Sequence, residues 1–132
     1  MKLLLLLFIL TLPAVAPIHI SPQPTIAGLV AYSAKVHHLP QALALQRCKS
    51  ESNFTNIVNH NRQGYYDVGP MQVNSRYHPE ILAAGLQQRI DIGVQILAAC
   101  RQACKNNSNC TNYMYIHGHR PLTPASKHGK VN

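Results

Sequence analysis

Acidic side chains are scarce in this chain of 132 residues. Four Asp and Glu stand against 12 Lys and Arg, so the formal net charge is +8. Tryptophan is absent, and the aromatic residues are six Tyr and two Phe. No second apolar run follows the N-terminal one, and there is no repeat or low-complexity block. The sequence therefore indicates one small domain, in which the position of each acid is informative.

The excess of positive charge predicts a polyanionic partner or surface. Nucleic acid is disfavoured, because the Lys and Arg residues are scattered singly and no aromatic residues are interleaved with them. We therefore expect no nucleic-acid partner. A bacterial cell wall is also polyanionic, and an exported protein would meet it first.

The N-terminal stretch "MKLLLLLFILTLPAVAP" predicts export. A basic residue precedes the apolar run 3–12, and "AVA" at 14–16 fits a small-residue cleavage site. Pro17 fits poorly as the first mature residue, so retention as a short membrane anchor is the alternative, although the run is short for a span. We expect a signal peptide over 1–20, one domain over 21–120 and a flexible tail over 121–132, in a periplasmic or secreted protein.

Four cysteines in an exported chain predict two disulfides, for which three pairings exist. Cys100 and Cys104 are one helical turn apart, which favours bonds to other segments over a bond between them. We expect Cys48–Cys100 and Cys104–Cys110. A zinc site that combines these cysteines with histidines is disfavoured, because the spacing matches no closed zinc site. We expect no metal and no cofactor.

The pattern along the chain predicts an α+β fold that is mostly α. Helices are expected at 25–38, from the N-cap of Thr25, and at 40–52, from Pro40. Loops with a small hairpin or two are expected over 56–75, where Asn, Gly and Pro punctuate β-prone pieces. A short helical turn from Pro79, a long helix over 86–104 and a short last helix over 110–119 complete the chain.

Glu51, in "CKSESNF", occupies an unusual place for a carboxylate. It follows Ala44 and Cys48 on one stripe of the second helix, so it shares a face with small apolar residues. It also lies near the helix C-terminus, where the macrodipole disfavours negative charge. Burial and the dipole both raise the pKa of the carboxyl, as a general acid requires. The alternative is an ordinary Glu at a frayed helix end.

The stretch "ALALQRCKSESNFTNIVNHNRQGYYDVGPMQVNS" resembles the core of the lysozyme-like lytic transglycosylases, especially small exported ones that accompany secretion and conjugation machines. Its "ES" and "GPMQVN" match the Glu-Ser and "GLMQIN" motifs of that family, and "DIGVQILAAC" and "YMYIHG" follow in the family's order. The likeness covers residues 26–118. It implies a lysozyme-like fold with a small loop and β-hairpin lobe, a glycan substrate and no cofactor.

Carried over position by position, the resemblance implies Glu51 as the catalytic acid and base and Ser52 as a residue that orients it. It further implies that the glycan groove is lined by Met71, Gln72 and Asn74, and that the hydroxyl of Tyr115 points toward Glu51. Three positions depart from the family pattern, namely Pro70, Ile116 and His117. Without tryptophan, sugar stacking would fall to Tyr65, Tyr66, Tyr77 or Phe54.

The implied reaction cleaves the β-1,4 bond between N-acetylmuramic acid and N-acetylglucosamine in peptidoglycan and leaves 1,6-anhydro ends. Asp67 opens an alternative, because hydrolytic lysozymes pair their acid with a second carboxylate. Asp67 could serve in that role, or it could cap the turn before Gly69. Glu80 and Asp91 are interpreted as structural. Two hypotheses without catalysis compete with these, namely a wall-binding protein and a basic antimicrobial or nucleic-acid binder. We expect a monomer.

Overall fold

The computed structural model describes residues 14–17 and 22–117. The expected tail at 121–132 and most of the expected signal peptide at 1–20 lie outside these residues. Within the described part, no helix is both long enough and apolar enough to cross a membrane. Cleavage, retention and export therefore stay predictions from the sequence.

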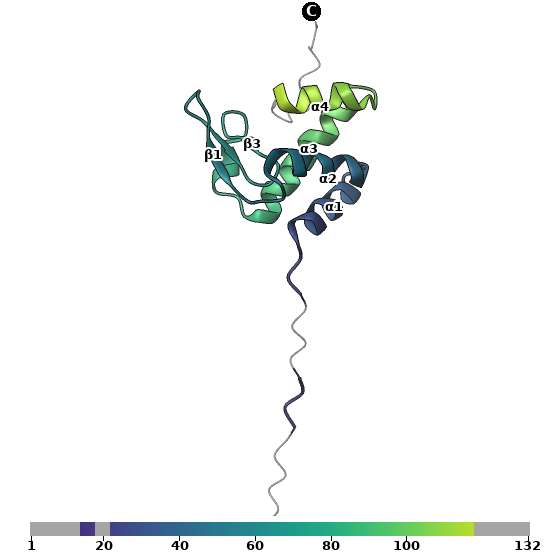
Figure 1. Cartoon of the computed structure of the whole chain (residues 1–132), viewed down its shortest axis with the longest axis vertical. Coiled ribbons are helices and arrows are strands. Elements are labelled where there is room, and N and C mark those ends of the chain that lie inside the picture. The colour runs from purple at the N-terminus through teal and green to yellow at the C-terminus, as the bar shows by residue number, and fades with distance from the viewer. Residues whose placement is uncertain (1–13, 18–21, 118–132) are drawn as a thin grey trace, which may run out of the picture.

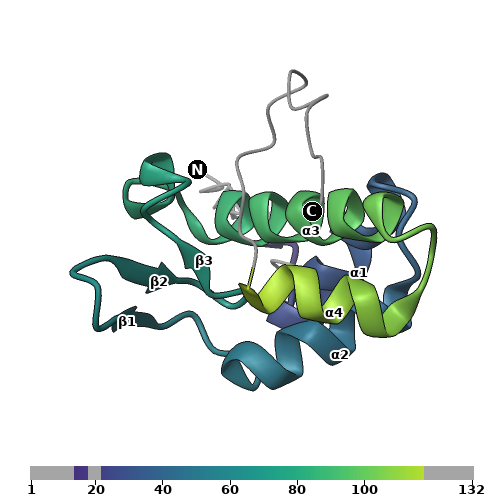
Figure 2. The same ribbon diagram turned by 90° about the horizontal axis from the view of Figure 1, so that it is seen from above.

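The fold is α+β and mostly α, as predicted (Figure 1). In chain order the elements are α1 (Ile26–Val36), α2 (Gln41–Ser52), β1 (Val58–His60), β2 (Tyr66–Val68), β3 (Val73–Asn74), the 3-10 helix η1 (Pro79–Leu82), α3 (Leu86–Ala103) and α4 (Ser108–His117). The three strands form a small lobe at one side of the helices (Figure 2). The last helix begins two residues earlier than expected.

Local signals explain where the first two helices begin and end. The Oγ1 atom of Thr25 accepts a hydrogen bond of 3.0 Å from the backbone N–H of Gly28, which caps α1 as predicted. Pro40 precedes α2, where its fixed φ suits the start of a helix. Asn53 ends α2 in the left-handed conformation, with a φ of 50°.

The lobe is a three-stranded antiparallel sheet in the order β1-β2-β3, which is two successive hairpins, the larger of the two numbers that the sequence left open. Asp67 on β2 lies opposite both Asn59 on β1 and Asn74 on β3. Gly69, with a φ of +80°, turns the chain between β2 and β3. The register places the three polar residues in one row across the sheet.

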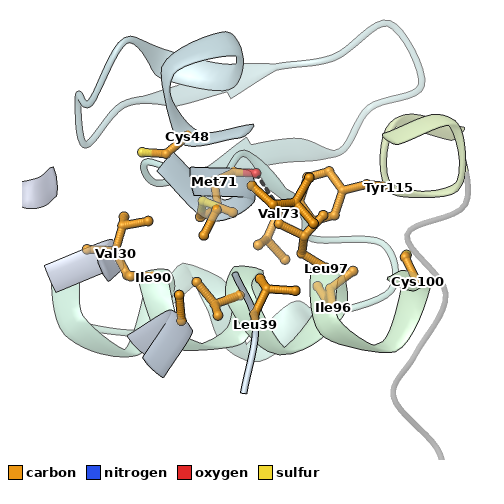
Figure 3. Close-up of a cluster of buried hydrophobic side chains, with 14 of the residues drawn as sticks. Val30, Leu39, Cys48, Met71, Val73, Ile90, Ile96, Leu97, Cys100 and Tyr115 are labelled. Carbon is orange, nitrogen blue, oxygen red and sulfur yellow. Dashed lines mark hydrogen bonds between the residues drawn. The ribbon is translucent and has the colours of Figure 1, made fainter. Parts of the chain in front are cut away.

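The core lies between α3 and the other elements (Figure 3). Ile90, Val94 and Leu97 on α3 are fully buried, which confirms the seam that the sequence predicts. Gly93 on the same helix lets the turn before β3 come close. A Cβ atom there would lie only 2.3 Å from the Cβ atom of Met71. The helix and the lobe therefore meet at a position that requires glycine.

One of the two predicted disulfides is present and the other is not. Cys104 and Cys110 form a disulfide that joins the end of α3 to α4, as expected. Cys48 and Cys100 are free and buried, so the expected Cys48–Cys100 bond is wrong. Figure 3 shows why: the two side chains enter the core at opposite ends of the apolar cluster.

Asp91 links the first and third helices. Its Oδ1 atom accepts a hydrogen bond of 2.9 Å from the hydroxyl of Ser33 and lies 2.7 Å from Nε2 of His37, while Oδ2 accepts from Gln95 at 2.7 Å. Three partners on two helices make Asp91 a structural residue, in agreement with the sequence interpretation.

Candidate active site

Glu51 lies in the last turn of α2, where the helix meets the sheet (Figure 2). Its side chain is 20% exposed, while Ala44 and Cys48 on the same stripe are fully buried. The apolar stripe predicted from the sequence is therefore real, and Glu51 forms its solvent-accessible end.

One cation holds the carboxylate. Nη1 of Arg47, one helical turn earlier, donates a hydrogen bond of 2.9 Å to Oε1 of Glu51. The guanidinium also lies over the ring of Tyr115, 5.9 Å from its centroid. Arg47 was not among the residues predicted from the sequence. The sequence did contain a signal for this ion pair, because Arg47 and Glu51 are four residues apart and therefore adjacent on one face of the helix.

The pKa of Glu51 is raised above its ordinary value of 4.5. Burial is the largest cause, the charge and hydrogen bond of Arg47 oppose it, and the negative charge of Asp67 raises the pKa further. The predicted direction is confirmed, with burial as the dominant reason. A carboxyl group in this state can donate a proton at a pH where an exposed Glu is already ionised.

Asp67 is the second carboxylate of the site. It lies on β2, half-buried, and its Oδ1 atom accepts a hydrogen bond of 2.8 Å from Nδ2 of Asn74 across the strand pair. Its charge acts on Glu51 from the sheet side. The alternative in which Asp67 caps the turn before Gly69 is not the contact seen, because the side chain bonds to the neighbouring strand.

Ser52 joins the end of α2 to the turn that precedes β3. Its hydroxyl donates a hydrogen bond of 2.8 Å to the carbonyl oxygen of Pro70, and its Oγ atom accepts from the backbone N–H of Thr55 at 3.1 Å. These contacts fix the helix end that carries Glu51 against the lobe. That Ser52 orients Glu51 stays a prediction.

Met71 and Gln72 do not line a surface with their side chains, which corrects that expectation. Met71 is fully buried against Gly93. Gln72 is 6% exposed, and its amide bonds to Asn59 at 2.7 Å and to the carbonyl oxygen of Gly69 at 2.9 Å. Both residues turn inward because the tight turn directs their side chains toward α3 and β1.

Tyr115 supports the site from α4. It is fully buried, and its hydroxyl donates a hydrogen bond of 2.7 Å to the carbonyl oxygen of Met71 (Figure 3). Burial raises the pKa of Tyr115 well above 10.0, and the charge of Glu51 adds to the effect. Tyr115 thus lies within electrostatic reach of Glu51, and the bond that positions its hydroxyl goes to the turn before β3.

The aromatic residues considered for stacking fall into two groups. Phe54 is partly buried and packs against the core. Tyr65, Tyr66 and Tyr77 are 38%, 40% and 40% exposed on the lobe. The exposed tyrosines are therefore the ones available to a ligand.

A surface depression of about 510 Å³ lies between the loop that joins α1 to α2 and the C-terminal half of α3, and Glu51 does not line it. His37 and His38 from the loop and Arg101 from α3 are among its lining residues. Among the described residues, no group of three or more His, Cys, Asp or Glu side chains could hold a metal ion.

No protein-family model, curated protein or solved structure matches this chain. Its function is consequently inferred from the geometry around Glu51 and from the motif resemblance.

Proposed function

We propose that the protein is an exported, lysozyme-like lytic transglycosylase that cleaves the glycan strands of peptidoglycan. The observation that carries the proposal is a mostly buried Glu51 carboxyl that bonds to Arg47, lies within electrostatic range of Asp67 and has a raised pKa. The "ES" and "GPMQVN" motifs support it, because Ser52 bonds to Pro70 and so brings the two motifs together. The net charge of +8 suits a polyanionic wall.

In the proposed reaction Glu51 acts twice. Its protonated carboxyl first gives a proton to the glycosidic oxygen between N-acetylmuramic acid and N-acetylglucosamine, and the bond to the anomeric carbon breaks. The carboxylate then takes the proton of the substrate's own C6 hydroxyl as that oxygen bonds to the anomeric carbon. Glu51 ends protonated, and the product carries a 1,6-anhydro ring. The nucleophile is already part of the substrate, which lowers the entropic cost.

Hydrolysis is the second candidate, and one observation favours it. Asp67 is near enough to raise the pKa of Glu51, as in enzymes that work with two carboxylates. In that mechanism water takes the place of the C6 hydroxyl, and Asp67 stabilises positive charge at the anomeric carbon or bonds to it. The hydrogen bond from Asn74 would orient Asp67 in either case.

Mass spectrometry of fragments released from purified peptidoglycan tests the proposal. We expect anhydro-muramyl ends from the wild type and at least a hundredfold less release from Glu51→Gln, since general acid catalysis contributes about 10²–10⁴-fold. Glu80→Gln is the matched control, because Glu80 is an exposed carboxylate on η1. Reducing ends would select the hydrolase. If the wild type releases no fragments under any condition, the remaining hypothesis is a wall-binding protein without catalysis.

A secretion or conjugation machine as partner follows only from the resemblance and stays a prediction, as does the monomeric state. Pull-down of the full chain with its cell envelope would test the first, and sedimentation would test the second.

A further inference from the structure

The guanidinium of one arginine on the lobe lies over two tyrosine rings. The guanidinium carbon of Arg76 lies 5.6 Å from the ring centroid of Tyr65 and 5.6 Å from that of Tyr77. Both tyrosines and Arg76 are exposed. We call these three residues the Arg76 clamp.

The Arg76 clamp presents a cation without a protein counterion. Among the described residues, Arg47 bonds to Glu51 and Arg89 bonds to Asn56, whereas the guanidinium of Arg76 makes no hydrogen bond or ion pair. A guanidinium that lies over aromatic rings keeps its N–H donors available at its edge. Holding the group also lowers the entropy lost when it binds a ligand. The clamp is thus prepared for an anion that can accept two parallel hydrogen bonds.

The clamp is continuous with the candidate active site. Asp67 and Asn74 are paired across β2 and β3, and the backbone N–H of Arg76 donates a hydrogen bond of 2.9 Å to Oδ1 of Asn74. Arg76 therefore follows the Asp67–Asn74 pair directly, in the turn that comes after β3. Asn74 thus links Arg76 to Asp67, whose charge acts on Glu51.

We propose that the Arg76 clamp binds a carboxylate of the peptide stems of peptidoglycan, so that the protein selects peptide-bearing glycan. This inference rests on the proposed function. A planar carboxylate is the anion that matches the guanidinium fork, and peptide stems carry carboxylates beside the glycan chain. The muramyl lactyl group becomes a free carboxylate only when the stem is removed, which allows the two sources to be distinguished.

Binding is measured in the Glu51→Gln background, which removes turnover. The probes are soluble glycan strands with intact peptide stems, the same strands after amidase treatment, and chito-oligosaccharides. Arg76→Gln is expected to weaken binding of the peptide-bearing strands about tenfold, the loss typical of a charged hydrogen-bonded contact. The other two probes should change less than twofold. Arg62→Gln, an exposed arginine of the β1–β2 turn, is the matched control for lost charge.

Two further variants distinguish the hydrogen-bonding geometry of the guanidinium from its positive charge. Arg76→Lys keeps the charge and should recover less than half of the lost affinity. Tyr77→Leu should weaken binding of the peptide-bearing strands alone, because it loosens the guanidinium.

Three outcomes overturn the inference. If Arg76→Gln binds the peptide-bearing strands as well as its parent does, the Arg76 clamp does not bind the stem, and the proposed function is unaffected. If Arg76→Gln loses as much affinity for amidase-treated strands as for peptide-bearing ones, Arg76 contacts the lactyl carboxylate or acts only through general electrostatic attraction. If the Glu51→Gln protein binds no glycan probe, the proposed function and the inference fall together. Unfolding curves that match the parent protein show that each variant is folded.

Discussion

The carboxyl group of Glu51 is subject to opposing influences from its surroundings. Burial and the charge of Asp67 raise its pKa, whereas Arg47 lowers it through charge and a hydrogen bond. The net effect is a raised pKa, because desolvation outweighs the single cation. Arg47 and Asp67 therefore act on the same proton in opposite directions.

The first prediction concerns the pH profile of cleavage. A general acid is active while protonated, so kcat/KM should fall as the pH rises through the pKa of Glu51. Arg47→Gln removes the lowering influences and should move that falling limb to higher pH. Asp67→Asn removes a raising influence and should move it to lower pH. Rates on soluble peptidoglycan across pH measure both shifts.

Opposite shifts would show that both groups act through the Glu51 proton. Shifts in the same direction, or a limb that stays in place in both variants, would contradict the assignment of Glu51 as the acid. Lys49→Gln, an exposed cation on α2, is the control for a general loss of charge.

At the scale of elements, the contact between α3 and the lobe depends on one missing side chain. A Cβ atom at Gly93 would lie 2.3 Å from Cβ and 2.7 Å from Cγ of Met71, and 3.3 Å from the hydroxyl oxygen of Tyr115. The same glycine thus sets the position of the turn that bonds to Ser52 and Tyr115.

The second prediction is that Gly93→Ala destabilises the protein by about 1–3 kcal/mol, the usual cost of overpacking a core. That cost exceeds the gain of about 1 kcal/mol from helix propensity. Gly85→Ala at the N-cap of α3, where a Cβ atom would meet nothing within 4 Å, is the matched control and should stay within about 1 kcal/mol of the wild type. Urea unfolding compares them, and equal stability of the two variants would refute the close approach.

The third prediction concerns the link between α1 and α3. Burial raises the pKa of Asp91, but the hydrogen bonds from His37, Ser33 and Gln95 outweigh it, so the pKa lies below 3.8. A lowered folded-state pKa stabilises the protein above 3.8, and the contribution is lost as the pH falls through the folded-state value. The wild type should therefore exceed Asp91→Asn in stability at neutral pH.

Thermal unfolding at a series of pH values measures this difference. We expect it to shrink as the pH falls below 3.8. A gap between the two proteins that persists in strong acid would mean that the ionised carboxylate is not the source of the stability.

The fourth prediction concerns the cysteines. Denatured, unreduced protein should expose two free thiols, Cys48 and Cys100, and peptide mapping should find Cys104–Cys110. Burial raises the pKa of Cys100 to about 11, so its thiol stays protonated and unreactive in the folded state. The disulfide closes a short loop, so Cys110→Ser should cost about 2 kcal/mol. Absence of free thiols would restore the Cys48–Cys100 pairing.

At the scale of the whole molecule, the fold class followed from local signals. Thr25, Pro40 and Pro79 mark helix starts through hydrogen bonding and fixed φ, and these effects need no tertiary context. The sequence left open whether one hairpin or two would form, because β3 has two residues and exists only by pairing with β2. Short strands carry too little periodicity to be recognised alone.

For the candidate site, the sequence predicted the position of Glu51 but not the orientation of the side chains around it. The stripe of α2 located Glu51 at a buried edge, because helical periodicity determines which face a residue occupies. Periodicity shows that Cys48 and Cys100 both face the core. It does not show which positions of two packed helices lie side by side, so it could not exclude a Cys48–Cys100 disulfide. It also could not orient Gln72, whose φ of 51° turns its side chain inward.

The fifth prediction follows from the charge of the whole chain. A net charge of +8 attracts a polyanionic wall over distances set by the salt concentration. Raising the salt from about 50 mM to about 500 mM shortens the screening length severalfold and should weaken wall binding by about tenfold. Binding of uncharged chito-oligosaccharides should stay constant, since no counterions are displaced. Arg76→Gln removes one positive charge and should leave most of the salt dependence in place. Wall binding that ignores salt would show that the basic surface serves another partner.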